Sequence, residues 1–412
     1  MDTIIEGARA VLPHGVEKVS VRVSDGRIAA LDGPRGGAEV IDGAGLLLAP
    51  AMIDVHGDAF ERQIMPRPNV FFPLDGAVLD TDRQLAANGI ATAFHALTLS
   101  WEPGLRSVDR GRAFIAALAR LRPRLTVENR VQLRWETFCP EAIPLIAEAL
   151  QDPQTPSVAF NDHTSMILRH PSIPIQDRPF DHDPAFRIAD WDDPVLLSRM
   201  KGRADRAEMT AEAFLALCRA KWATRPEVPG WIAEVSAAAR SAGAAMLSHD
   251  DTRIETRDWY RGQGARIAEF PMTWEVARHA RASGDAIVFG APNAVRGGSH
   301  IGSPGTADMV SAGLCDILAS DYHYPAMSGA VARLLAEGRG PLHELWKLVS
   351  TNPARASNIT DRGEIVPGQR ADLVLLDWPE GEVPTVRMTM VAGRIAHAAL
   401  PLGAARAALA EA

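Results

Sequence analysis

Apolar runs of strand length recur through the middle of the chain, and each is followed by a segment that could form a helix. This alternation predicts parallel strands joined by crossover helices. Eight repeats favour a closed (β/α)8 barrel of the TIM type over an open sheet, and chemistry in such a barrel lies at the carboxyl ends of the strands. The runs end at polar residues: His56, His95, Glu136, His163, His249, Glu269, Asn293 and Asp321.

The two ends of the chain have a different pattern, with short strands and turns. Residues 19–23 alternate apolar and polar positions, and Asp25-Gly26 and Asp32-Gly33 are turn pairs. Residues 363–398 repeat this pattern. Because a few short strands need a partner for their open edges, we expect one small composite β-sandwich domain from residues 1–49 and 355–398. The barrel would then occupy residues 50–354, and residues 399–412 are predicted to form a C-terminal tail helix.

The interval between His163 and His249 is longer than one crossover requires. Residues 169–193 are rich in Pro, Asp, Arg and His, which predicts a long loop over the barrel mouth, whereas residues 207–243 have a helical pattern. A long loop at this end of a barrel is typical of a functional segment; a surface excursion is the alternative.

Composition narrows the class of protein. The 412 residues, 47% of them hydrophobic, suffice for one large domain with a substantial core, and the net charge of −8 gives no support for nucleic-acid binding. Three widely spaced cysteines, Cys139, Cys218 and Cys315, indicate neither a disulfide framework nor a cysteine metal site. The N-terminus has no basic and apolar leader, and no apolar run approaches the ~20 residues of a membrane span. We therefore expect a cytoplasmic protein without membrane contact.

His56 and Asp58 end the first apolar run and, being two residues apart on a strand, point to the same face. An imidazole and a carboxylate on one face can hold a divalent metal. The alternative is a strand end whose polar groups are satisfied by the backbone, and the pair alone does not decide between the two.

In the third run, Gln132, Arg134 and Glu136 share a face, which makes poor core because buried charge must be paired. Either Arg134 and Glu136 form an ion pair inside the barrel, or Glu136 is a metal-bridging carboxylate positioned by Arg134. At the end of the fourth run, only one of Asp162 and His163 can face inward, and we favour His163.

Taken together, these strand ends predict a metal site. Two divalent ions ~3.5–4 Å apart require several hard or borderline ligands and a bridging anion, and they lower the pKa of a bridging water. Asp321 then suits a general base that orients this water. Zinc suits the histidines, and manganese or iron would also be accepted. The predicted metal ligands are His56, Asp58, Glu136, His163 and His249.

These features resemble the amidohydrolase superfamily of metal-dependent (β/α)8 hydrolases. The shared features are His56-X-Asp58 on the first strand, the strand-end histidines, the final-strand Asp321, and Ala371-Asp372-Leu373-Val374 in the composite β-domain. Within the superfamily the chain is similar to the phosphonate-degrading branch, the α-D-ribose 1-methylphosphonate 5-triphosphate diphosphatases. The motifs are His56-Gly57-Asp58, Met65-Pro66-Arg67-Pro68, Asp162-His163-Thr164, Ser248-His249-Asp250-Asp251, Gly290-Ala291-Pro292-Asn293, Arg296-Gly297-Gly298-Ser299-His300 and Ser320-Asp321-Tyr322.

The resemblance implies hydrolysis of a triphosphate ester by metal-activated water, with release of pyrophosphate, in phosphonate catabolism. The chain departs from this branch at Gly57, where threonine is expected, at Ser165, and at the added His323. The superfamily often bridges its metals with a carboxylated lysine. No lysine ends an apolar run here, which favours Glu136 as the bridge.

A glycine-rich loop after the seventh run indicates phosphate binding independently. Glycines let backbone N–H groups approach an anion, and the loops after strands seven and eight are the usual phosphate site of this barrel. Arg62 and Arg67, just after the first strand, could reach the same anion; solvated arginines beside a flexible loop are the alternative. The substrate-binding residues we predict are Arg62, Arg67, Arg296, Gly297, Gly298 and His300.

Two other functions fit the same pattern. A barrel with these metals could cleave a C–N bond, as an amidase or deaminase does, or the barrel could be a non-catalytic scaffold. The complete ligand set argues against the scaffold. The sequence also allows a homo-oligomer, and the expected partner is a small phosphorylated substrate.

Overall fold

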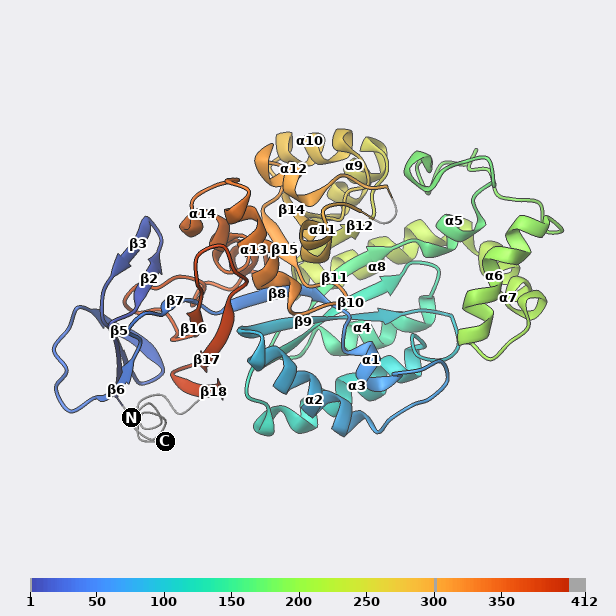
Figure 1. Ribbon diagram of the computed structural model, residues 1–412. Helices are drawn as coiled ribbons and strands as arrows, with labels where there is room; N and C mark the ends of the chain where they lie inside the picture. The colour runs from blue at the N-terminus through green and yellow to red at the C-terminus, as the bar shows by residue number, and fades with distance from the viewer. Residues whose placement is uncertain (1, 300–301, 400–412) are drawn as a thin grey trace.

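The computed structural model describes residues 2–299 and 302–399. Its centre is a sheet of eight parallel strands that follow one another in chain order (Figure 1), so the predicted barrel strands are confirmed. They are β8 (Met52–Gly57), β9 (Ile90–Leu99), β10 (Glu128–Glu136), β11 (Ser157–Asn161), β12 (Met246–His249), β13 (Ile267–Glu269), β14 (Ala286–Gly290) and β15 (Ile317–Ala319).

The first and last strands meet at their carboxyl ends. A parallel bridge joins Gly57 to Asp321, with Asp58 N–H donating to Asp321 O and Asp321 N–H to His56 O, both at 2.9 Å. The barrel therefore closes at the same end, and through the same residues, as the predicted site.

Helices cover the outer face of the barrel and fill most of the crossovers. They are α1 (Glu61–Ile64), α2 (Leu74–Ala87), α3 (Val108–Leu121), α4 (Ile143–Ala149), α5 (His163–Leu168), α6 (Pro194–Arg206), α7 (Ala211–Trp222), α8 (Val228–Ser241), α9 (Ile254–Gln263), α10 (Trp274–Ala282), α11 (Ala291–Arg296), α12 (Thr306–Ser311), α13 (Ala326–Ala336), α14 (Leu342–Lys347) and α15 (Thr351–Ala356). Single turns of 3-10 helix are η1 (Arg122–Arg124), η2 (Pro140–Ala142), η3 (Ile175–Asp177) and η4 (Arg225–Glu227).

Local sequence signals set several helix ends. Asp193 caps α6 by accepting from Val195 N at 2.7 Å, and Pro194 occupies the first helical position, where a missing N–H costs nothing. Thr273 caps α10 by accepting from Val276 N at 3.2 Å. Gly264 ends α9 at φ +107°, a conformation that favours glycine.

The inside of the barrel is filled by small and branched side chains from six of its strands: Val55, Ala159, Leu247, Ile267, Val288, Ile317 and Ala319. A larger apolar core lies between the strands and their outer helices and includes Phe114, Trp135 and Phe160. His95 belongs to this outer layer, because β9 continues to Leu99 and its ring packs edge-on against Phe60 and Phe114. The expectation that the second strand ends at His95 was wrong.

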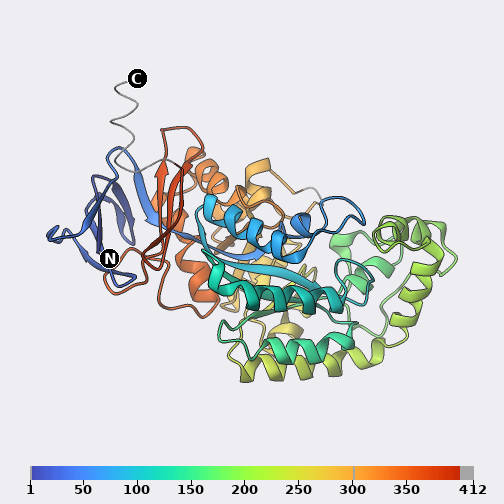
Figure 2. The same ribbon diagram turned by 90° about the horizontal axis from the view of Figure 1, so that it is seen from below.

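Strands from both ends of the chain form two sheets (Figures 1 and 2). One has the order β5-β4-β1-β6 and the other β18-β17-β16-β7-β2-β3. One apolar core between them combines Ile5 and Val21 with Leu375 and Met388, which is the expected composite sandwich. The strands are β1 (Thr3–Glu6), β2 (Arg9–Leu12), β3 (Gly15–Lys18), β4 (Val21–Ser24), β5 (Arg27–Leu31), β6 (Glu39–Asp42), β7 (Leu47–Pro50), β16 (Leu373–Asp377), β17 (Thr385–Val391) and β18 (Arg394–Ala398).

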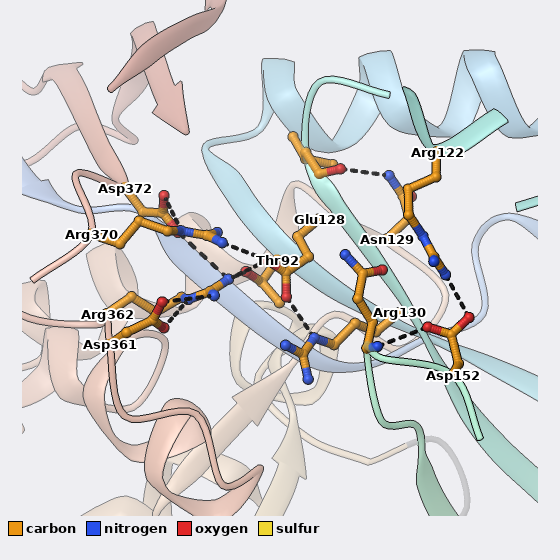
Figure 3. A network of polar contacts seen from close by, with 12 residues as sticks. Thr92, Arg122, Glu128, Asn129, Arg130, Asp152, Asp361, Arg362, Arg370 and Asp372 are labelled. Carbon is orange, nitrogen blue, oxygen red and sulfur yellow. Dashed lines mark hydrogen bonds and ion pairs between the residues drawn. The ribbon is translucent and has the colours of Figure 1, made fainter. Parts of the chain in front are cut away.

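An ion-pair network joins the C-terminal segment to the amino end of β10 (Figure 3). Glu128 contacts Nη1 of Arg362 at 2.7 Å and Nη1 of Arg370 at 2.5 Å. Arg370 also pairs with Asp372, just before β16, so the network links the barrel to the β-sandwich at the end opposite the predicted site.

The long interval between β11 and β12 forms a separate lobe. Residues 169–193 are mostly irregular, as predicted, and α6 and α7 pack on each other through Leu196, Met200, Phe214 and Cys218. Both views place this lobe at the end of the molecule away from the β-sandwich (Figures 1 and 2).

Among the described residues, no helix is long and apolar enough to cross a membrane. The predicted tail helix, apart from residue 399, lies outside the described residues.

Candidate functional site

Two histidines and a glutamate from three different strands meet inside the barrel mouth. Oε1 of Glu269 lies 3.0 Å from Nδ1 of His56, and Oε2 lies 2.7 Å from Nδ1 of His249. The two imidazole rings are stacked, with their centroids 5.5 Å apart, and the edge of Phe270 packs against both. All three polar side chains are buried, so their geometry is fixed by packing as well as by hydrogen bonds.

Attraction between opposite charges in this triad has a larger effect on the pKa values of His56 and Glu269 than burial has. Burial alone would lower the pKa of His56 and raise that of Glu269, but their mutual attraction reverses both shifts. The Glu269 carboxylate is held ionised, and Gln132 donates a further hydrogen bond to its Oε1 at 2.8 Å.

Three groups of potential metal ligands overlap at this point. Within each group the ligand atoms lie within 4.8 Å of one another. The groups are His56, His249 and Glu269; His163, His249 and Asp250; and His56, Asp58 and Asp321. His56 and His249 each belong to two groups, so the set resembles a continuous centre rather than scattered acidic residues.

The donor atoms fit a divalent metal. Nε2 of His56 is buried without a hydrogen-bond partner among the described residues, which is costly unless another group binds it. With Glu269 beside both Nδ1 atoms, Nε2 is the nitrogen of each histidine that would bind a metal. Nη2 of Arg134 lies 2.8 Å from Nε2 of His249, and its Nη1 is 3.8 Å from Asp58. This guanidinium is therefore the cation that these acceptors hold in the structure.

A cavity of about 250 Å3 opens in front of the triad. Candidate ligands and the loop after β14 line it together. The lining includes His56, Asp58, Arg134, His249, Asp250, Asp321, Arg296, Gly298, Ser299 and Ser303.

Three residues at the cavity have left-handed backbone conformations although none is glycine. Asp250 (φ +58°), Phe270 (φ +54°) and Asp321 (φ +54°) each follow a barrel strand within two residues. Such conformations cost about 1–3 kcal/mol each and cluster at functional sites. Here they turn the chain just after β12, β13 and β15 so that the side chains reach the cavity.

Gly57 stands where a side chain would collide with the buried polar groups below the site. A Cβ there would lie 2.6 Å from Oδ2 of Asp54 and 2.9 Å from Oγ of Ser320. The same Asp54 oxygen accepts from Ser320 Oγ at 2.5 Å, which ties β8 to the residue after β15. A larger residue at position 57 would disturb this hydrogen bond between Asp54 and Ser320.

Glu136 and His163 form a neighbouring contact, with Nδ1 of His163 at 3.2 Å from Oε2 of Glu136. Glu136 also accepts from the backbone of His163 and Thr164 and from the Thr164 hydroxyl, and burial raises its pKa to about 7. It belongs to none of the three ligand groups found among the described residues, and the alternative Arg134–Glu136 ion pair does not form there either. Metal bridging by Glu136 remains a prediction.

The fourth strand end resolves which of its two side chains faces the centre. The ring of His163 lies edge-on to His249, with centroids 6.2 Å apart. Asp162 instead caps α5, accepting from Ser165 N at 2.7 Å and from Ser165 Oγ at 2.6 Å. The geometry agrees with the choice of His163 as the inward residue.

The predicted anion-binding residues do not all share one cavity. Arg296 and Gly298 line the cavity of the triad, whereas Gly297 ends α11 with φ +79° beside Arg333. Arg62 lines a second cavity, and Arg67 forms a short bridge with Val70 outside both. The expectation that Arg62 and Arg67 reach the same anion as Arg296 is therefore not supported by their positions. His300 lies outside the described residues.

Asp321 lines the same cavity as the candidate ligands and belongs to one of their groups, with His56 and Asp58. Burial, together with the neighbouring Asp58 carboxylate, raises the pKa of Asp321 to about 6. A carboxyl group near neutrality can both take and return a proton, as the predicted general base must.

Glu269 and Asp250 are site residues to which the sequence assigned no role. Both stand where the sequence could have identified them: Glu269 ends the sixth apolar run, and Asp250 follows the histidine that ends the fifth. A short strand shows too few alternating positions to decide which of its side chains face the inside of the barrel. The strand β13, for example, has only three residues.

The sequence matches the family model described as "Amidohydrolase family" over residues 74–397. The chain is also 31% identical over 379 residues to an alpha-D-ribose 1-methylphosphonate 5-triphosphate diphosphatase of Escherichia coli (strain K12). That alignment covers 90% of this chain and 94% of the relative.

Solved structures with the same fold cover nearly the whole chain. A D-hydantoinase aligns with a TM-score of 0.58 and 14% identity, over 96% of this chain and 95% of that chain. A beta-aspartyl dipeptidase of Fervidobacterium islandicum AW-1 aligns with a TM-score of 0.59 and 16% identity, over 96% of both chains. At this identity, the likeness establishes the fold alone.

Proposed function

Since the chain belongs to the amidohydrolase family, we propose that it is a metal-dependent diphosphatase that acts on a triphosphate ester. The substrate class is that of its 31% identical relative, a phosphorylated ribose that carries a 5-triphosphate and a 1-methylphosphonate. Water would attack the phosphorus nearest the sugar. The bond from that phosphorus to the oxygen it shares with the second phosphorus would break, and pyrophosphate would leave.

His56, Asp58, His163 and His249 would hold the metal, with Asp250 and Glu269 as further candidates. Two ions fit the overlapping ligand groups, and zinc, manganese or iron would suit a set of imidazoles and carboxylates. When bound, such an ion polarises a phosphoryl oxygen and makes water more acidic. Glu136 is the remaining candidate for a bridging ligand.

The chain's own residues would position the substrate and move the proton. Asp321, beside Asp58 at the cavity, would accept the proton of the attacking water through its carboxylate oxygen. Arg296 and the backbone of Gly298, which line the same cavity, would neutralise the charge that develops on the departing pyrophosphate. Phe270 and Met272 would limit the entry of other water molecules.

One observation supports this proposal most directly. The cavity that exposes the candidate metal ligands is also lined by Arg296 and the glycine-rich turn after α11. A single substrate molecule could therefore contact a bound metal and these phosphate-binding groups at the same time. A C–N hydrolase that acts on an uncharged amide would need the same metal ligands but not Arg296.

The test is a substrate panel with two readouts. Protein loaded separately with zinc, manganese or iron would be assayed on ribose 5-triphosphate esters for pyrophosphate release. The C–N substrates would be hydantoins and cyclic ureides, scored by ring opening to the carbamoyl product, and β-aspartyl dipeptides, scored by release of free amino acids. We expect pyrophosphate release from the triphosphates only. Turnover of an amide or ureide at a higher kcat/KM would replace the proposal with C–N hydrolysis. A folded, metal-loaded protein that turns over neither class would favour the scaffold.

A further inference from the structure

A second charged cavity lies beside the first. It has a volume of about 230 Å3, and its lining includes four arginines and two glutamates, a surplus of two positive charges. The charged residues are Glu61, Arg62, Glu102, Arg106, Arg203 and Arg206. They come from α1, the loop after β9 and helix α6 of the lobe, so three separate segments converge on this cavity.

Two of the four arginines are neutralised by ion pairs that hold the walls together. Arg106 makes a bidentate contact with Glu61, with both distances 2.9 Å, and Arg203 lies 2.6 Å from Glu102. Both pairs are partly buried. The Arg203–Glu102 pair ties α6 of the lobe to the loop after β9, and the Arg106–Glu61 pair ties that loop to α1.

The other two arginines have no carboxylate partner among the described residues. Arg62 donates from Nη2 to the backbone oxygen of Tyr322 at 2.7 Å, and Arg206 makes no ion pair there. Arg206 is exposed, and partial burial and the repulsion of Arg203 and Arg106 lower its pKa against the attraction of Glu102 and Glu61. A bound anion would oppose this shift. The protein thus maintains uncompensated positive charge at a cavity that could hold a phosphonate or phosphate group.

The two cavities share a thin wall. Asp58, which lines the first cavity, is hydrogen-bonded through its backbone to Glu61 of the second, at 3.0 Å. Tyr322 lines the first cavity and accepts from Arg62 of the second. The two cavities are therefore adjacent, and a molecule with anions at both ends would have to reach over this wall to contact both.

We propose that this second cavity binds the anionic group at the far end of the substrate, and so selects sugars that carry a phosphonate or phosphate in addition to the 5-triphosphate. Arg62 and Arg206 would contact the remote anion, and the Arg106–Glu61 and Arg203–Glu102 pairs would position them. The proposal rests on the proposed function for the identity of the reacting end. It adds a specificity site to which α1, the loop after β9 and helix α6 of the lobe all contribute.

The kinetic test compares two substrates that differ only at the remote end. One is α-D-ribose 1-methylphosphonate 5-triphosphate, and the other is methyl α-D-ribofuranoside 5-triphosphate, which lacks the second anion. Arg206→Ala should raise KM for the first about 10- to 100-fold, with kcat nearly unchanged, and leave the second unaffected. Lys201→Ala removes a charge from the exposed face of the same helix, outside the cavity, and should change neither.

A binding measurement separates this proposal from the proposed reaction. Methylphosphonate alone would be titrated into the metal-loaded full-length protein and followed by 31P line broadening. We expect binding that Arg206→Ala weakens and Lys201→Ala does not, even if no triphosphate is hydrolysed. Failure of the wild-type protein to bind methylphosphonate, or an Arg206→Ala effect of equal size on both triphosphates, would overturn the assignment. If no triphosphate is turned over but the Arg206-dependent binding is present, only the proposed reaction fails.

Discussion

Glu269 lies 2.7 Å from Nδ1 of His249, buried at the centre of the barrel mouth. The contact fixes which ring nitrogen of His249 carries the proton and therefore which one faces the candidate metal position. The same carboxylate holds Nδ1 of His56 through its other oxygen. One side chain thus orients two histidines from β8 and β12, which are not neighbours in the sheet.

Replacing Glu269 by glutamine should weaken metal binding although the shape of the side chain is kept. A neutral amide cannot accept from both histidines, so one ring loses its preferred tautomer. We expect about a 10- to 100-fold loss of metal affinity or activity. Metal content after dialysis against buffers of defined free metal measures this loss. Glu234→Gln, an exposed change on α8, is the control and should have wild-type affinity.

Removing a histidine should have a larger effect than removing the group that orients it. His56→Ala and His249→Ala each delete a donor that belongs to two of the three candidate ligand groups. We expect metal content and turnover to fall together, by about tenfold or more. The assay is metal analysis and activity on one preparation of each variant. Full occupancy and full turnover in either variant would contradict the ligand assignment.

Asp321→Asn should separate chemistry from metal binding. The amide is close in shape but cannot accept a proton, and losing a positioned acid–base group typically costs about 10²- to 10⁴-fold in rate. Most of the metal should remain, because the other candidate ligands are untouched. Single-turnover rates at saturating metal provide the measurement, and a fully active Asn variant would remove Asp321 from the mechanism.

The sequence predicts the barrel well because its periodicity is local information. Each apolar run reports burial on both faces of a strand, and eight such runs predict the order of eight parallel strands. The composite sandwich was also predictable, since neither end of the chain has enough strands to bury its own apolar face.

The centre of the site was harder to predict because it depends on distances across the barrel. Nothing in the sequence indicates that Glu269 lies between His56 and His249, which are 193 positions apart along the chain. The same limit applies to Arg134, for which the sequence offered Glu136 as a partner two residues away. In the structure the guanidinium reaches across to His249 and Asp58 instead.

Arg296 should matter for the substrate and not for the metal. Arg296→Ala removes one charge-assisted contact worth roughly 1.5–3 kcal/mol, or about a 10- to 150-fold loss in kcat/KM if the contact persists in the transition state. The loss should be confined to phosphorylated substrates, with unchanged metal stoichiometry. Arg278→Ala, an exposed arginine that stacks on Trp274 outside the cavity, is the matched control. Normal kinetics of Arg296→Ala on the best triphosphate would count against a phosphate role for this loop.

The network around Glu128 makes a prediction about stability and pH (Figure 3). Burial alone would raise the pKa of Glu128, but Arg362, Arg370 and Arg130 lower it to about 2. A carboxyl group whose pKa is lower in the folded state stabilises the fold above its unfolded pKa, near 4.5, and loses this contribution as the pH falls toward 2. The difference corresponds to about 3 kcal/mol at neutral pH.

Glu128→Gln should therefore destabilise the protein by about 3 kcal/mol at pH 7, and by only about 2 kcal/mol at pH 3.5, since the carboxyl group takes up protons there in the unfolded chain but not in the folded protein. Urea unfolding followed by circular dichroism at both pH values gives the difference. Glu148→Gln breaks an exposed pair with Arg112 and should cost less than about 1 kcal/mol at either pH. If the difference in the free energy of unfolding between wild type and Glu128→Gln is the same at both pH values, the network stabilises the contact between barrel and β-sandwich through packing and not through the charge of Glu128.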